Sequence, residues 1–132
     1  MAEQIDDPEE TAATVPADAP GQLAVEVRYE PDTAFVTAVG EIDVVTAPRL
    51  AAAVEETLRT NVRHIAIDLT GTTFMDSTGI HVLVQAQERA RQDVAVICGP
   101  GPVLRTLELL GLAAPLNVVP SLDVHKRRRS GS

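Results

Sequence analysis

Aromatic residues are nearly absent from this sequence. Its 132 residues include no tryptophan, one tyrosine and two phenylalanines, so aromatics make up 2% of a chain that is 45% hydrophobic. A core must therefore be built from valine, leucine, isoleucine and alanine, which suits a small layered α/β domain. So few aromatic side chains also leave little for stacking on nucleobases, a common means of binding single-stranded nucleic acid.

Cysteine, histidine and lysine are scarce as well. The single cysteine, Cys98, excludes an internal disulfide, and it follows the apolar run VAVI, where a buried thiol is expected. The three histidines are scattered and show no spacing typical of a metal site. The only lysine is Lys126, so residues 23–120 contain none.

Basic residues are outnumbered by acidic ones, and the two signs are unevenly spread. The formal net charge is −8. Residues 1–22 carry six acids and no base, whereas residues 121–132 carry four bases and one acid. The segment between them is net acidic, which disfavours nucleic acid and anionic membranes as main partners.

Long apolar runs are missing too. None reaches the length of a membrane span, and the N-terminus lacks the basic-then-apolar order of a signal peptide. We therefore expect a soluble cytoplasmic protein with one folded domain over residues 23–120. Residues 1–22, which are rich in acid, proline and alanine, are expected to be a disordered tail, and residues 121–132 a flexible basic tail.

Strand-like and helix-like patterns alternate between the tails. Strands are expected at 23–29, 34–40, 63–69, 93–98 and 116–119, and the first two should pair as an antiparallel hairpin. Helices are expected from a Thr46 cap to Leu58, from Ser77 to about Arg91, and over 103–110. Residues 70–76 read as a connection. This order predicts an α/β fold in which helices pack on a mixed sheet of four to five strands.

Residues 74–80, FMDSTGI, place an acid, two hydroxyls and a glycine where a helix is expected to begin. Ser77 can cap the unpaired backbone N–H groups of the first turn, but the same N–H groups and the helix dipole would also accept a phosphate. Gly79 either eases the turn into the helix or lets a partner approach Ser77 closely. Phe74 and Met75 are expected to anchor the segment in the core. These residues alone leave a cap and a phosphorylation switch both open.

Two motifs together carry a resemblance to a known family. GEIDVVTAPRL occupies residues 40–50, after the second expected strand. IDLTGTTFMDSTGIHVL occupies residues 67–83 and runs from the third strand into the next helix. The motifs and their spacing resemble the anti-sigma factor antagonists of the STAS domain family, and the alternation of elements matches that family over about 23–120.

The resemblance implies a STAS fold and a role in partner switching. In that family an antagonist binds an anti-sigma factor, which is also a serine kinase of the GHKL ATPase type, and so releases a sigma factor that regulates transcription. The kinase phosphorylates the antagonist and dissolves the complex, and a PP2C-type phosphatase restores the antagonist. This implies a binding protein rather than an enzyme, with no cofactor, no metal and no direct contact with nucleic acid or membrane.

The same resemblance assigns residues to the switch. It implies that Ser77 is the phosphoacceptor and that Asp43, Asp76, Thr78 and Gly79 surround it. Thr78, which stands where many relatives have serine, is a lesser candidate for the acceptor. The sequence also departs from the family at residue 81, where a histidine replaces a commonly small residue.

Four alternatives compete with this interpretation. A serine hydrolase needs a Gly-x-Ser-x-Gly elbow, but residue 75 is methionine. A phosphoaspartate receiver would use Asp68, but residues 23–120 lack lysine and an acid pair after the first strand. The GPGP segment at 99–102 could cradle a nucleotide phosphate, although its prolines remove N–H donors. The last alternative is a STAS scaffold without kinase regulation.

Overall fold

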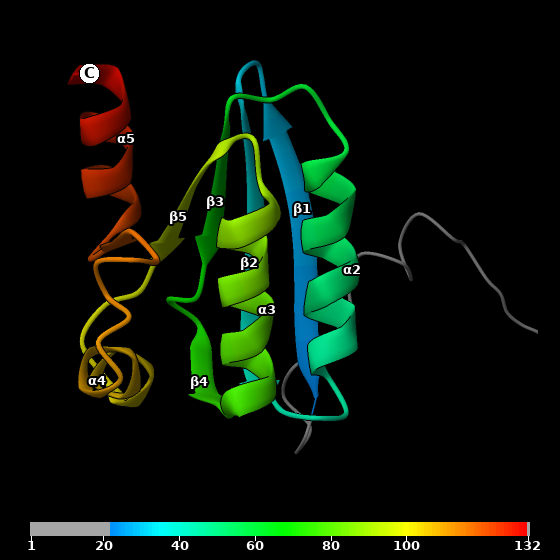
Figure 1. The fold of residues 1–132 in the computed structure, drawn as a ribbon, viewed down its shortest axis with the longest axis vertical. Coiled ribbons are helices and arrows are strands. Elements are labelled where there is room, and N and C mark those ends of the chain that lie inside the picture. The colour runs from blue at the N-terminus through cyan, green and yellow to red at the C-terminus, as the bar shows by residue number, and fades with distance from the viewer. Residues whose placement is uncertain (1–21, 132) are drawn as a thin grey trace, which may run out of the picture.

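A computed structural model describes residues 22–131 of the chain (Figure 1). The strands are β1 (Leu23–Glu30), β2 (Thr33–Ile42), β3 (His64–Asp68), β4 (Thr72–Met75), β5 (Asp93–Ile97) and β6 (Val118–Val119). The helices are α2 (Ala47–Leu58), α3 (Ser77–Arg89), α4 (Pro102–Leu109) and α5 (Leu122–Gly131). The predicted α/β class and mixed sheet are confirmed. The predicted disordered tail lies, apart from its last residue, outside the described residues.

The sheet is organised around β2, which is ten residues long. β1 pairs with it antiparallel along its length, which confirms the predicted hairpin, and the other pairs in the sheet are parallel. The strand order is β1-β2-β3-β5-β6, and β4 adds to β2 beyond β3. The first half of β2 therefore pairs with β3 and its last residues with β4.

The prediction of a connection at 70–76 was wrong, because residues 72–75 form β4 and the sheet has six strands among the described residues. The strand is only four residues long, too short for alternation to show in the sequence. Its pairing with β2 is also irregular, with a shift in register between Gly40 and Glu41. A short strand of this kind is defined by its neighbour rather than by its own sequence.

The two faces of the sheet are covered differently. On one face, alternate β2 residues such as Ala34 and Val36 belong to a large core that includes Leu50 of α2 and Leu83 of α3. Figure 1 shows α2 and α3 side by side over this face. On the other face, a smaller buried cluster consists of Phe35, Ala66, Ile97 and Val119, and Leu122 and Val124 of α5 pack against it.

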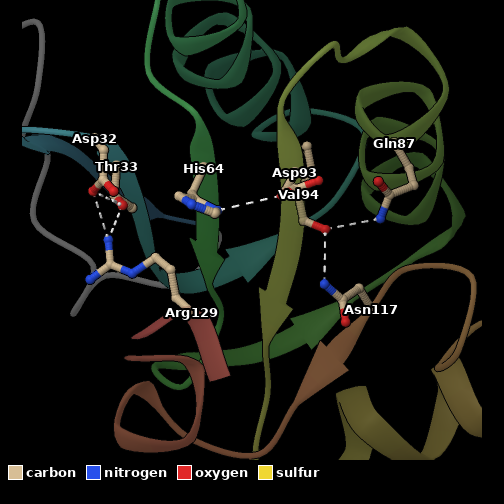
Figure 2. A network of polar contacts seen from close by, with 8 residues as sticks. All are labelled: Asp32, Thr33, His64, Gln87, Asp93, Val94, Asn117 and Arg129. Atoms are coloured by element: carbon tan, nitrogen blue, oxygen red, sulfur yellow. Dashed lines mark hydrogen bonds and ion pairs between the residues drawn. The ribbon is translucent and has the colours of Figure 1, made fainter. Parts of the chain in front are cut away.

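The basic C-terminal segment was predicted to be a flexible tail, but it forms α5. The ring of His125 is buried and meets Phe35 edge to face, with centroids 6.3 Å apart. Arg129 lies 3.1 Å from the Asp32 carboxylate and also donates to the Thr33 hydroxyl (Figure 2). Polar side chains hold much of this helix in place, so its sequence shows little apolar periodicity.

The start of α3 packs tightly on the sheet at Gly79, which is buried. A Cβ atom there would lie 2.5 Å from Cγ of Met75 and 2.7 Å from Cγ2 of Ile42. The glycine therefore lets α3 approach β2 and β4. A side chain at residue 79 would point into the core. The predicted role of Gly79 in letting a partner approach Ser77 therefore does not fit the structure.

We expect Gly79→Ala to lower the free energy of unfolding by about 1 to 2 kcal/mol, because overpacking outweighs the gain in helix propensity. Chemical denaturation measures the change. Gly99→Ala is the matched control, since its Cβ would meet only the Pro120 carbonyl oxygen at 3.5 Å. The control should change stability by less than about 0.5 kcal/mol. Equal effects of the two substitutions would contradict the close approach of α3.

The burial of His125 should make stability depend on pH. Burial lowers the pKa of His125, and the positive charges of Arg129, His64 and Lys126 lower this pKa further. The unfolded chain, whose histidine pKa is about 6.5, then binds more protons than the folded chain as the pH falls below that value. The stabilisation is therefore present above about pH 6.5 and is lost as the pH falls.

Urea denaturation at about pH 7.5 and about pH 5.5 checks this expectation. Wild-type protein should lose more stability between the two values than His125→Gln, in which the titrating group is absent. His81→Gln replaces an exposed histidine, so it should behave like the wild type. A His125→Gln protein with the wild-type loss would show that another group is responsible.

Candidate functional site

The residues assigned from the sequence meet at one end of the sheet, where β2 and β4 both end. Ile42 and Met75 are paired in parallel register, so Asp43 and Asp76, which follow them, are neighbours. The backbone N–H of Asp76 donates to the carbonyl oxygen of Ile42 at 3.0 Å. Both α2 and α3 begin close after this pair, so two helix N-termini share this end (Figure 1).

Asp76, rather than Ser77, caps α3. Its carboxylate accepts a hydrogen bond from the backbone N–H of Thr78 at 2.9 Å and another from the Thr78 hydroxyl. The hydrogen bond from the Thr78 hydroxyl and those from the N–H groups of Thr78 and Gly79 lower the pKa of Asp76. The predicted helix start at Ser77 is confirmed, but the predicted cap was wrong by one residue. Aspartate and serine are equally good caps, so the sequence alone did not distinguish them.

This cap separates the two hydroxyl groups. Thr78 is half-buried and its hydroxyl is engaged with Asp76. Ser77 is exposed in the first turn of α3, and its hydroxyl has no hydrogen-bond partner among the described residues. An enzyme that approaches this end of the protein therefore meets the Ser77 hydroxyl without first breaking a contact.

Asp43 has a similar role at the start of α2. Its carboxylate accepts hydrogen bonds from the backbone N–H groups of Val45 and Thr46, each at 3.0 Å. Thr46 stands at the predicted N-cap position but caps nothing; its hydroxyl donates to the carbonyl oxygen of Glu41 at 2.8 Å. The N–H of Asp43 donates to the same hydroxyl oxygen at 2.9 Å. Asp43 thus fixes the turn between β2 and α2.

The prediction for the residues before Asp76 is half correct. Met75 is buried, as expected, and packs in the main core. Phe74 was also expected in the core, but its side chain is 49% exposed. Successive side chains of β4 point to opposite sides of the strand, so Met75 and Phe74 cannot both face the core.

Exposed apolar side chains gather on the elements around this site. We call this set the apolar rim; it consists of Val44, Val45, Phe74, Leu109 and Leu110. The valines lie in the turn before α2, the phenylalanine on β4, and the leucines at the end of α4, which contacts β4. Figure 1 shows these elements at the end of the molecule where α3 begins. Sequence reasoning missed this surface, because its residues come from three separate parts of the chain.

The other candidate groups are less suited to chemistry. Cys98 is buried, as predicted, and burial together with Asp68 and Glu108 raises the pKa of its thiol. It therefore stays protonated near neutral pH. Within residues 22–131, no three potential metal-ligating side chains lie close enough to share an ion. No helix in that range is long and apolar enough to span a bilayer.

Comparison with known proteins agrees with this fold. A model of the STAS domain family matches residues 24–125. The chain is 31% identical over 96 residues to the anti-sigma-F factor antagonist RsfB of Mycobacterium tuberculosis, covering 71% of this chain and 79% of that protein. It is 36% identical over 95 residues to an anti-sigma-B factor antagonist of Listeria monocytogenes, covering 69% and 83% respectively.

A solved structure gives the same result. The crystal structure of an anti-sigma factor antagonist from Mycobacterium paratuberculosis superposes with a TM-score of 0.76 at 28% identity, covering 80% of this chain and 92% of that chain. The family match runs past residue 120 into α5, in keeping with the packing of this helix on the sheet. The chain therefore belongs to the STAS-domain family of anti-sigma factor antagonists.

Proposed function

We propose that this protein is an anti-sigma factor antagonist that binds a cognate anti-sigma factor and thereby releases a sigma factor. The observation that carries the proposal is the exposed hydroxyl of Ser77, set in a rigid helix start beside an apolar rim. Exposed apolar side chains that gather at one site favour contact with another protein. The names of the relatives supply the class of partner. Such a role belongs in the cytoplasm, alongside the transcription machinery.

Phosphorylation of Ser77 is the proposed switch. A phosphate adds about −1.5 to −2 charges, and the N-terminus of α3 tolerates it because of the helix dipole and the unpaired N–H groups of the first turn. The carboxylate of Asp76 already holds the N–H of Thr78, so it keeps α3 capped in either state. The fold should therefore persist when Ser77 is modified.

The partner, in contrast, should respond strongly to the modification. Binding through the apolar rim removes water from this end of the molecule, and a doubly charged phosphate without a matching cation is costly to desolvate. Asp43 and Asp76 add negative charge close by. The modified protein should thus lose affinity through electrostatics and desolvation rather than through unfolding.

The identities of the kinase and phosphatase rest on the family resemblance. The kinase would be the anti-sigma factor itself, a GHKL-type serine kinase, and a PP2C-type phosphatase would reverse its action. The geometry supports serine as the acceptor in preference to threonine, because the Thr78 hydroxyl is half-buried and bound to Asp76. A kinase would have to break that contact to reach Thr78.

One test concerns the residue that accepts the phosphate. Incubation with the anti-sigma kinase and ATP should place phosphate on wild-type protein and on Thr78→Val, but not on Ser77→Ala. Mass spectrometry of the digested protein measures the site. Phosphate that persists on Ser77→Ala and disappears from Thr78→Val would reverse the assignment. Binding without phosphate on any variant would indicate an antagonist that the kinase does not regulate.

Another test concerns the negative charge at Ser77 and the apolar rim. Ser77→Asp and Leu109→Ser should each weaken binding of the anti-sigma factor by at least about tenfold, through charge and through lost apolar burial. Calorimetric titration measures the affinity. Asn61→Asp and Tyr29→Ser make the same kinds of change at exposed positions away from the site and should bind like the wild type. Unchanged affinity of Ser77→Asp would contradict the electrostatic switch, and unchanged affinity of Leu109→Ser would contradict a role for the rim.

A further inference from the structure

The β1 strand leaves one long edge of the sheet open (Figure 1). β1 ends the strand order and pairs with β2 alone among the described residues, whereas β6 at the opposite edge is only two residues long. The α2 helix contacts both β1 and β2, so it covers a face of the sheet rather than this edge. β1 has eight residues, contains no proline or lysine, and pairs with β2 without a shift in register. An edge without such protection favours pairing with another strand.

The register of the hairpin determines which backbone groups of β1 point outward. The N–H of Glu41 donates to the carbonyl oxygen of Gln22 at 3.2 Å, so Gln22 faces β2. Residues of an antiparallel pair alternate between bonding to the neighbour and facing away from it, so the even-numbered residues of β1 bond to β2 as well. The odd-numbered residues direct their N–H and C=O groups outward, where no other described segment pairs with them; they are Leu23, Val25, Val27 and Tyr29.

The side chains of β1 carry a charge pattern that complements itself. Glu26 and Arg28 flank Val27 and lie on the same face of the strand. When two copies of β1 run antiparallel and centre on Val27, Glu26 of each copy lies opposite Arg28 of the other. Opposite charges placed directly across two strands stabilise their pairing.

Neighbouring registers lack this complementarity. Outward groups recur at every second residue, so the next registers centre on Glu26 or on Arg28. The first of these places the two copies of Glu26 opposite each other, and the second does the same with Arg28. Like charges directly opposite each other destabilise a pair of strands. The charges of β1 therefore select the register centred on Val27.

The guanidinium of Arg28 has donors left for this contact. It lies over the ring of Phe35, 4.4 Å from the centroid, and that contact uses its flat face rather than its N–H groups. Its distance of 3.7 Å to the Glu30 carboxylate is too long for a hydrogen bond, and its side chain is 51% exposed. Glu26 is exposed and has no ion-pair partner within residues 22–131.

The opposite face of β1 is apolar at the same positions. Val27 is half-buried against the main core, and in this register it meets Val27 of the second copy. Tyr29, whose side chain is exposed, lies opposite Val25 of the second copy. Cross-strand pairs of aromatic and β-branched residues are among the more favourable ones in antiparallel sheets. Both faces of the strand thus fit a second copy of the same strand.

We propose that two copies of this protein pair through β1 into a symmetric dimer with a continuous sheet. The two Val27 residues exchange a pair of backbone hydrogen bonds, and Val25 of each copy does the same with Tyr29 of the other. The two-fold axis closes the assembly, so no further copy adds to it at this edge. The junction is small, so association is weak and reversible. The inference does not depend on the function proposed for Ser77.

A second copy suits this edge better than the segment of the chain that precedes β1. Residues 1–21 contain six acids, no base and three prolines. Proline cannot donate a hydrogen bond to a strand, and a segment without bases offers no counterpart to Glu26.

Sedimentation equilibrium of the full chain between about 10 µM and about 1 mM tests the association, and the dimer fraction should rise over this range. Hydrogen exchange locates it. The amides of Val25, Val27 and Tyr29 should gain protection as the concentration rises, whereas those of Glu26 and Arg28 should be protected throughout because they bond to β2. A chain that stays monomeric at about 1 mM would overturn the proposal. Protection of the outward amides in the monomer would also overturn it, since residues of the same chain would then cover the edge.

Exchange of the two charges tests the register. Glu26→Arg places arginine opposite arginine, and Arg28→Glu places glutamate opposite glutamate, so each should raise the dimer dissociation constant at least about tenfold. An equimolar mixture of these two variants should associate like the wild type, because each pair across the junction then joins an arginine to a glutamate. The double variant should dimerise for the same reason.

Glu88→Arg is the matched control, because it makes the same change at an exposed residue of α3. It should dimerise like the wild type, and amide spectra verify that every variant is folded. Dimers that persist in both single variants would place the interface elsewhere. A mixture of the single variants that stays monomeric would exclude the register centred on Val27. Either result would overturn the proposal.

Discussion

The parallel pairing of the end of β2 with β4 is the interaction on which the candidate site depends. It places Ile42 beside Met75, and the hydrogen bond from Asp76 to Ile42 continues the pairing by one residue. Both chains then turn into helices, and each turn is held by the carboxylate of an aspartate. Gly79 lets α3 lie against the same two strands. An exposed serine in the first turn of α3 thereby gains a fixed position without contributing to the fold itself.

This arrangement separates the residues that stabilise the fold from the serine that we propose as the switch. Asp76 holds the backbone, Thr78 supports Asp76, and Gly79 fills a place where no side chain fits. Among residues 76–79, Ser77 is the one whose side chain does not support the fold. A group that reacts reversibly should occupy such a position, because its modification then changes the surface while the core remains the same.

Much of this could be predicted from the sequence, and the failures have physical causes. Strong periodicity gave the long strands and α2, and the two motifs indicated the family. The β4 strand was missed because four residues cannot show a period, and α5 was missed because Arg129 and His125 anchor it through polar and edge-on contacts. The cap was misplaced by one residue because serine and aspartate cap equally well. The apolar rim depends on which elements meet in space, and no local pattern records that.

The cover that α5 provides for the second face of the sheet has a practical consequence for handling the protein. Phe35, Ala66 and Ile97 are almost fully buried, and α5 supplies the partly buried apolar residues that pack against them. A chain shortened to residue 120, the end of the folded domain expected from the sequence, would present these side chains to water. Contiguous apolar surface on a sheet promotes self-association. Studies of the isolated domain should therefore keep the basic C-terminal segment, since it contributes to solubility as well as to charge.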